Sequence, residues 1–335
     1  MLKIALKESE LGVSVKNVLA SEKYLSIKSD NYGWFVDENF YMPFFVSKKL
    51  IFKWMVITYP PITLTMDISS ESEKAFLDSI CLYLKAHRNV CDHITMPQTN
   101  VVFNVETTYG ENIPWGSYIV DLCKTDDELM MSFHSKHRNV IKKAMKDGVT
   151  VNLNADPNDV YQCIKDTLIR QHVHYPELSY YNALIEKIPN NVGFFTSNFN
   201  NEVEGCALVI YDNEHAYYMY GGSSAKPHTG SVNYLQYELM KFLRDKGVKE
   251  YDMVGARLVY ESGSKYEGIQ RFKSRFASGL KRGYTFRFVV SPFKFWLFNK
   301  AVSLYCKLNK IEYKDTIDET KRLMKDKNNE NIISE

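Results

Sequence analysis

The sequence predicts an α/β chain with two domains. At 335 residues the chain is long enough for two domains of ordinary size. Short apolar runs rich in Val, Ile and Tyr alternate with amphipathic stretches, which indicates strands alternating with helices. We expect the first domain at residues 1–150, the second at 151–288, and an amphipathic helix with a polar tail at 289–335.

The composition excludes several classes of protein. Lys and Arg number 42 against 40 Asp and Glu, so the bulk charge indicates no polyanionic partner and any basic signal must be local. The six cysteines form no Cys-x-x-Cys pair, which argues against a disulfide framework and a zinc ribbon. Cys91-Asp92-His93 is the nearest approach to a ligand cluster, and a structural role is the better interpretation of it. We therefore expect no metal and no bound cofactor.

The distribution of apolar residues predicts a cytoplasmic protein. The N-terminal residues contain no apolar core typical of a secretory signal. The most apolar stretch, residues 40–66, is interrupted by three lysines and by Pro60-Pro61, which argues against a membrane span.

The first half of the chain contains signals for several strands and one long helix. Residues 34–46 predict a hairpin that turns at Asp37-Glu38-Asn39, and residues 70–87 predict an amphipathic helix capped by Ser70 or Ser72. Further strands are expected at residues 54–59, 94–105 and 117–122.

A basic helix is predicted at residues 134–147. Its apolar stripe comprises Val140, Ile141, Ala144 and Met145. The remaining surface carries Lys136, Arg138, Lys142, Lys143 and Lys146. Such a surface is either a solvated face or a phosphate-binding face, and the sequence leaves both interpretations open.

The second half of the chain is organised around a hairpin, a glycine-rich segment and a helix. Residues 203–211 and 216–220 predict the hairpin, and a loop with Gly221, Gly222 and Gly230 should follow it. We expect Asn233 to cap the next helix, Gly247 to end it, and a strand to follow at residues 251–254. This order places a helix N-terminus beside two strand ends, where a phosphate or an oxyanion would be stabilised. The alternative is that the glycines only turn the chain.

Several of these segments, in this order, resemble the FemAB-like family, which forms peptidoglycan bridges by aminoacyl transfer and belongs to the GNAT-fold acyltransferases. The resemblance extends over about residues 20–285 and is carried by residues 128–151, 202–224, 233–238, 246–252 and 268–276. It implies two tandem GNAT-like domains, each with a mixed, mostly antiparallel sheet flanked by helices.

The resemblance also implies a transfer centre at Phe272-Lys273. Attack of an amine on an ester or thioester builds negative charge on the carbonyl oxygen, which the Lys273 cation would stabilise. From the residues alone, Lys273 could equally be a surface lysine whose stem covers Phe276. Basic and aromatic residues alternate over residues 257–287, as they do where a ring stacks and a phosphate is neutralised. The substrate-binding candidates are Lys28, Arg138, Tyr220, Gly221, Gly222, Ser223, Asn233, Arg257, Tyr266 and Arg271.

The expected function is therefore transfer of an aminoacyl or acyl group onto an amine of a peptidoglycan or surface-polysaccharide precursor, either nucleotide- or lipid-linked. The donor would be aminoacyl-tRNA or acyl-CoA. Two alternatives stay open: an acetyl-CoA-dependent N-acetyltransferase acting on a sugar nucleotide or glycan, and a non-catalytic module that binds a nucleotide or glycan. Met96 stands where the family members that act on wall precursors keep an Asp, so this sequence departs from the pattern there.

A C-terminal amphipathic helix is predicted over residues 291–310, with Pro292 in its first turn. Its broad aromatic face beside lysines is typical of a helix at a membrane interface. The alternative is that the helix packs back on the first domain. The expected partners thus include tRNA and a peripheral contact with the cytoplasmic leaflet.

Overall fold

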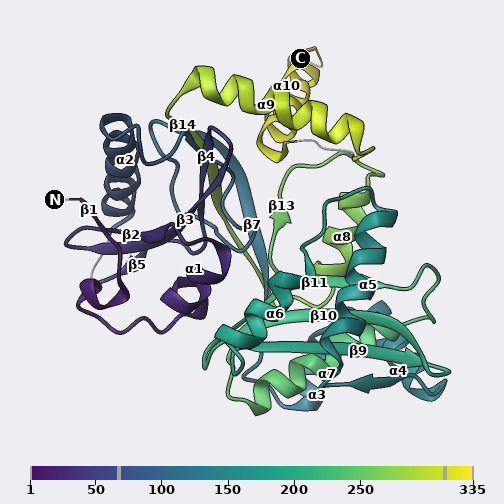
Figure 1. Cartoon of the computed structure of the whole chain (residues 1–335). Helices are drawn as coiled ribbons and strands as arrows, with labels where there is room; N and C mark the ends of the chain where they lie inside the picture. The colour runs from purple at the N-terminus through teal and green to yellow at the C-terminus, as the bar shows by residue number, and fades with distance from the viewer. Residues whose placement is uncertain (1, 66–68, 312–314, 334–335) are drawn as a thin grey trace. The chain divides into compact units, whose positions relative to one another are not determined.

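The computed structural model describes residues 2–65, 69–311 and 315–333 (Figure 1). The chain forms two compact units. Unit 1 contains residues 1–117, 255–268 and 281–335, and unit 2 contains residues 118–254 and 269–280. These boundaries differ from the expected division at residue 150, because the basic helix packs with the core of unit 2. The C-terminal segment likewise belongs to unit 1 instead of standing apart.

Unit 1 is built on a sheet in the order β1-β2-β3-β4-β6-β14, in which neighbouring strands are antiparallel except for the parallel pair β4 and β6. The short strand β5 pairs with β3, and the short strand β13 pairs with β7. The strands are β1 (Lys3–Ala5), β2 (Tyr32–Val36), β3 (Phe40–Lys49), β4 (Phe52–Ile57), β5 (Ile62–Thr63), β6 (His93–Ile94), β7 (Glu111–Asp121), β13 (Ala256–Arg257) and β14 (Gly279–Val289). The helices are α1 (Glu22–Lys28), α2 (Ser70–Ala86), α9 (Pro292–Leu308) and α10 (Thr316–Ile333).

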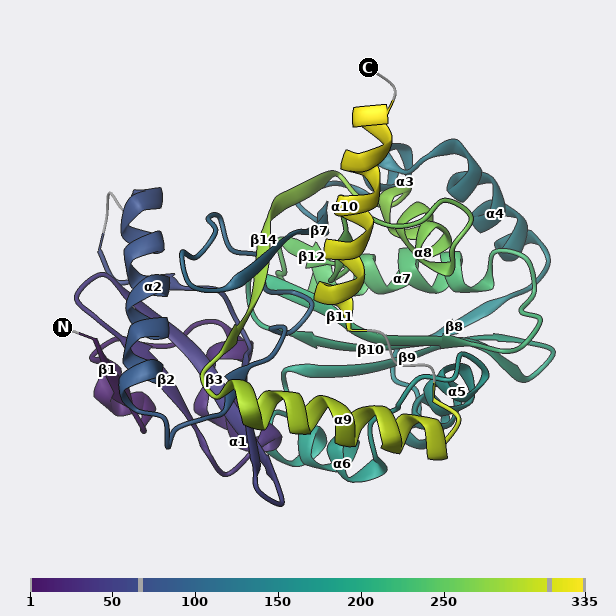
Figure 2. The same cartoon turned by 90° about the horizontal axis from the view of Figure 1, so that it is seen from above.

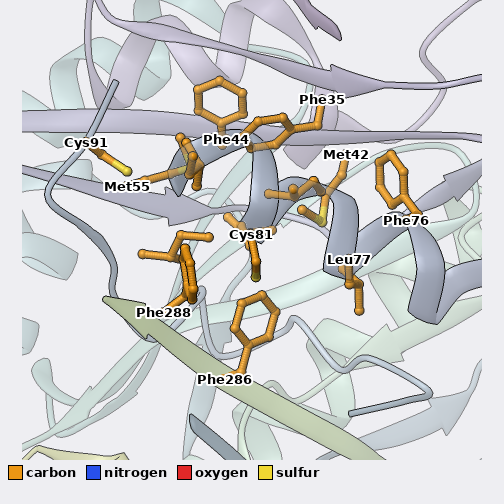
Figure 3. Close-up of a cluster of buried hydrophobic side chains, with 14 of the residues drawn as sticks. Phe35, Met42, Phe44, Met55, Phe76, Leu77, Cys81, Cys91, Phe286 and Phe288 are labelled. Carbon is orange, nitrogen blue, oxygen red and sulfur yellow. The ribbon is translucent and has the colours of Figure 1, made fainter. Parts of the chain in front are cut away.

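The core of unit 1 lies between the sheet and α2. The Phe35 and Phe44 rings pack together with their centroids 4.6 Å apart. Leu77 and Cys81 of α2 belong to the same cluster, as does Phe286 of β14 (Figure 3). Ser69 caps α2, one residue before the expected cap. The strand expected at residues 94–105 is reduced to the end of β6, because most of that segment runs as an irregular buried chain.

Unit 2 is built on a second sheet in the order β7-β12-β11-β10-β9-β8, in which only β11 and β12 are parallel. The strands are β8 (Thr150–Asn152), β9 (Val192–Phe199), β10 (Glu202–Tyr211), β11 (His215–Ser223) and β12 (Glu250–Asp252). The helices are α3 (Asp126–Ser132), α4 (Ser135–Lys146), α5 (Pro157–Arg170), α6 (Leu178–Lys187), α7 (Ser231–Asp245) and α8 (Lys265–Ser274).

Helices cover both faces of this sheet: α5 and α6 lie on one face, and α3, α4 and α7 lie on the other (Figures 1 and 2). The prediction of a mixed, mostly antiparallel sheet flanked by helices is therefore confirmed in both units.

The predicted hairpin, helix and strand in unit 2 are confirmed as β10-β11, α7 and β12. The Asp212 carboxylate turns the hairpin by accepting from the backbone N–H groups of Glu214 and His215 at 2.9 and 2.8 Å. Gly247 ends α7 with a φ of +90°, a left-handed conformation that favours glycine. β11 and β12 are parallel, and β12 ends at Asp252, which pairs with Tyr217 near the start of β11.

The C-terminal helix begins at Pro292, as predicted, and one of its faces packs on unit 1. The Phe298 ring lies 5.6 Å from Phe52 and 5.4 Å from Trp54, measured between ring centroids. This finding supports the interpretation that α9 packs back on the first domain. Within the described residues, every helix is too short or too polar to cross a membrane.

Candidate active site

The expected transfer centre, Phe272-Lys273, lies on helix α8, within the segment 257–287 where basic and aromatic residues alternate. Helix α8 packs on unit 2 through Phe272, whose ring lies 5.3 Å from Phe276 and 5.6 Å from His137 of α4. His137 also donates from Nε2 to the Phe272 carbonyl oxygen at 3.0 Å. These contacts position the last turn of α8, which carries Lys273.

The Lys273 ammonium is directed toward the end of β12 and is sheltered from water. Its Nζ donates to the carbonyl oxygen of Val254, just past the carboxyl end of that strand. Burial lowers the pKa of Lys273 to about 8 from 10.5, while the nearby Asp252 carboxylate opposes this shift. A lysine with this pKa is a cation at neutral pH and a base just above it.

The backbone beside Lys273 is strained. Val254 is β-branched and nevertheless has a φ of +40°, a conformation that such residues rarely adopt. The turn is held by the Asp252 carboxylate, which accepts from the Val254 N–H at 2.7 Å. Strain of this kind is concentrated at functional sites. Asp252, Val254 and His137 were not predicted from the sequence. The one signal for part of this turn was Asp252, an Asp at the end of a buried strand.

Tyr220 lies on strand β11, as predicted, but the strand continues through Gly221, Gly222 and Ser223, which corrects the prediction that a loop begins at Gly221. The two glycines are required by close packing. A Cβ at Gly222 would lie 2.8 Å from the Cys163 carbonyl oxygen and 2.9 Å from the Thr167 hydroxyl of α5. A Cβ at Gly221 would overlap the Tyr218 hydroxyl group. These residues therefore form the carboxyl end of β11, which continues beyond β12, whose last residue, Asp252, pairs with Tyr217.

The N-terminus of α7 is not the open anion site that the sequence suggested. The cap is Gly230, with a φ of +84°, and Asn233 lies inside the helix, which corrects its predicted role as N-cap. Ser231 is fully buried, and its N–H donates to the His228 carbonyl oxygen at 3.1 Å. A Cβ at Gly230 would lie 2.1 Å from the Val140 carbonyl oxygen of α4. The first turn of α7 is therefore packed against α4.

Arg138 has a structural partner in unit 2. Its guanidinium donates to the carbonyl oxygens of Met131 and Phe133, at the end of α3. Lys143 pairs with Asp147 at 2.6 Å, whereas Lys142 and Lys146 are exposed on the outer face of α4. Arg271 is exposed on α8.

The remaining candidates lie in unit 1. Arg257 stacks on the Tyr266 ring at 3.6 Å and pairs with Glu319 of α10 at 2.6 Å. Arg257 and Tyr266 line a cavity of about 240 Å³. Lys28 lies with its ammonium 5.1 Å from the centroid of the Tyr24 ring, and burial lowers the pKa of Lys28 to about 7.

Cys91-Asp92-His93 has a structural role, as expected. The Asp92 carboxylate accepts from the Lys53 backbone N–H and pairs with Lys294 of α9 at 2.9 Å. The buried His93 ring packs on Phe298, and burial lowers the pKa of His93 to about 4. In the part of the chain that the structure describes, no group of three or more His, Cys, Asp and Glu side chains could hold a metal ion.

The chain matches the family model described as "FemAB family" twice in tandem, at residues 102–204 and 200–302. A curated relative, the lipid II:glycine glycyltransferase of Staphylococcus haemolyticus, is 37% identical over 68 residues, which are 20% of this chain and 16% of the relative. The chain therefore spans only a small part of that relative.

Two solved structures share the fold. The crystal structure of FemX superposes with a TM-score of 0.62 at 15% identity, covering 89% of this chain and 99% of FemX. A conserved protein of unknown function from Bacteroides thetaiotaomicron superposes with a TM-score of 0.52 at 11% identity, covering 86% and 100% of the two chains.

The packing of β11 predicts that Gly222→Ala destabilises the protein by about 1–3 kcal/mol, because the added methyl group has no room beside α5. The matched control is Gly268→Ala on α8, where a Cβ would meet no atom within 4 Å. That change should be neutral or stabilise by up to about 1 kcal/mol. Urea unfolding of both variants checks this; equal effects would contradict the assigned packing.

Proposed function

Because the chain belongs to the FemAB family, we propose that it is an acyltransferase that moves an aminoacyl or acyl group onto an amine of a cell-envelope precursor. The observation that carries the proposal is the sheltered Lys273 cation beside Val254, just past the carboxyl end of β12. As the acceptor amine attacks the carbonyl carbon of the donor, the carbonyl oxygen of the donor gains negative charge. A fixed cation in a water-poor site stabilises that charge without having to reorganise.

In this mechanism Phe272 and His137 are positioning residues. Their contacts hold the last turn of α8 against unit 2, so that the Lys273 side chain stays extended toward the Val254 carbonyl oxygen. Burial disfavours the protonated form and lowers the pKa of Lys273, while the Asp252 carboxylate favours that form. A donor carbonyl oxygen would take its place beside the same ammonium group. Transfer then proceeds directly, without a covalent enzyme intermediate.

The packing of α7 favours aminoacyl-tRNA as the donor over acyl-CoA. A coenzyme A donor needs a loop and helix N-terminus with N–H groups available to its pyrophosphate. Here Gly230 lies against α4, Ser231 is buried, and the Ser231 N–H already has a partner. The exposed lysines of α4, Lys142 and Lys146, instead offer a surface for a polynucleotide.

We place the acceptor among lipid-linked wall precursors, because the matched segment comes from a lipid II:glycine glycyltransferase. Lys28, Arg257 and Tyr266 are proposed to bind its phosphate and ring groups, and the cavity beside Arg257 and Tyr266 supports this role. Met96 packs with Val102 and Trp115 and supplies no carboxylate, so recognition must differ from that of relatives with an Asp at this position. A lipid-linked acceptor would locate the enzyme in the cytoplasm, at the inner face of the membrane.

The Lys273 cation predicts that the transfer rate falls as the pH rises through about 8, because the ammonium loses its proton there. Lys273→Met should fold, since it removes a buried charge, and should lose about two to three orders of magnitude in kcat. Lys273→Arg keeps the charge and should shift the falling limb of the pH profile to higher pH. The measurement is single-turnover transfer from charged tRNA to an amine acceptor.

A rate that rises through pH 8 would contradict the cation role and would make Lys273 a base. Full activity of Lys273→Met at unchanged stability would show that Lys273 takes no part in the transfer. Absence of transfer by the unchanged chain would leave the non-catalytic binding module as the better description.

The donor assignment predicts that Lys142→Gln with Lys146→Gln weakens binding of charged tRNA and reduces its salt dependence. The matched control is Lys165→Gln with Lys187→Gln, on helices α5 and α6 of the opposite face. Filter binding over a range of salt concentrations measures both effects. If the two pairs behave alike, or if acetyl-CoA alone supports transfer, the proposed donor is wrong.

A further inference from the structure

Helix α9 has two apolar faces, and unit 1 covers one of them. The inner face includes Phe295, Phe298 and Cys306; Phe295 and Phe298 contact His93, with ring centroids 4.9 and 5.0 Å apart. The opposite face presents a stripe with helical spacing that is open to solvent. Its large residues are Phe293, Trp296, Leu304 and Leu308, which are 72%, 56%, 59% and 74% exposed.

A second exposed apolar element lies beside this helix. The turn between β3 and β4 consists of Leu50 and Ile51, which are 82% and 59% exposed. Lys49, at the base of the turn, has its ammonium 5.5 Å from the centroid of the Tyr305 ring on α9. The turn and the outer stripe of α9 therefore form one surface, which we call the α9 surface.

The turn contains residues that two-residue hairpin turns rarely use. A two-residue hairpin turn favours Asn and Gly, because it requires positive φ angles. Leu50 adopts a φ of +55°, and neither side chain of the Leu50-Ile51 pair is buried. An apolar pair at an exposed turn that stabilises neither the turn nor the core is a feature expected at a functional site.

The segments that form the α9 surface carry charge of one sign. Helix α9 and residues 47–54 contain no Asp or Glu. The exposed lysines beside the apolar residues are Lys49, Lys300, Lys307 and Lys310. A partner must therefore combine apolar depth with negative charge. A second copy of the chain would bring two lysine-rich surfaces together, and their like charges would repel each other.

We infer that the α9 surface docks on an anionic phospholipid bilayer, with Leu50, Ile51 and the outer stripe of α9 inserted among the headgroups and the lysines next to the phosphates. This arrangement is that of an interfacial helix. The inference rests on the proposed function only in that a lipid-linked acceptor lies at such a bilayer. Phe295 does not take part, because it packs on His93 and beneath the Arg287 guanidinium.

Cosedimentation with vesicles tests the inference. The full chain should bind vesicles of phosphatidylcholine with phosphatidylglycerol at low salt, and should bind phosphatidylcholine alone weakly. Leu304→Ser with Leu308→Ser should lower the partition coefficient about tenfold, and Leu50→Ser with Ile51→Ser should have a similar effect. Replacing Lys300 and Lys307 by Gln should lower it about fivefold per lysine and only with anionic vesicles.

The matched control is Leu6→Ser with Leu82→Ser, two leucines that are 62% and 49% exposed outside the α9 surface. The control should bind vesicles as the unchanged chain does. Equal loss in the control, or no binding by the unchanged chain at low salt, would overturn the inference. A concentration-dependent dimer that the Leu304 and Leu308 changes abolish, without vesicle binding, would assign the surface to a second copy.

All of these variants should transfer normally to a water-soluble acceptor, because none of the changed residues lies at Lys273. Failure of vesicle binding with normal transfer would overturn the docking surface alone. Full transfer activity of Lys273→Met with normal vesicle binding would overturn the proposed role of Lys273 and leave the docking surface intact.

Discussion

The proposed chemistry of this protein depends on the burial of one ammonium group, that of Lys273. Burial lowers the pKa of this lysine toward neutrality, and the Val254 carbonyl oxygen keeps the side chain directed at the carboxyl end of β12. Other features of unit 2 serve this placement. His137 and Phe272 fix the last turn of α8, and Asp252 holds the strained turn that presents the carbonyl oxygen. The fold thus maintains a cation where desolvation makes it most effective against developing charge.

Glycine and close packing determine which substrates this site can accept. Gly221 and Gly222 let Tyr218 and α5 approach β11, and Gly230 lets α4 cover the first turn of α7. In a protein that used coenzyme A, that turn would need N–H groups available to a pyrophosphate. The close packing at Gly230 is the reason for which we favour aminoacyl-tRNA as the donor. We propose that the tRNA binds the exposed lysines on the outer face of α4.

Elements set by local signals were predictable from the sequence. The β10-β11 hairpin, with its Asp212 turn, and the end of α7 at Gly247 follow from residues adjacent in the chain. The family resemblance also led to Phe272-Lys273. Features that depend on distant packing were not predictable. The glycines of β11 were interpreted as a loop because the approach of α5 is not visible in sequence, and Gly230 replaced Asn233 as the cap because α4 requires space there. The strain at Val254 and the two faces of α9 likewise became apparent only in three dimensions.

The most direct test of the central claim is the titration of Lys273 itself, followed by NMR on protein with ¹³C-labelled lysine side chains. We predict that Lys273 titrates with a pKa of about 8, well below the ordinary value of 10.5, and that its signal disappears in Lys273→Arg. Lys28, with a pKa of about 7, is distinguished because its signal persists in that variant. A Lys273 signal that titrates near 10.5 would contradict the account, because the ammonium would then be exposed to water and unable to act as a sheltered cation.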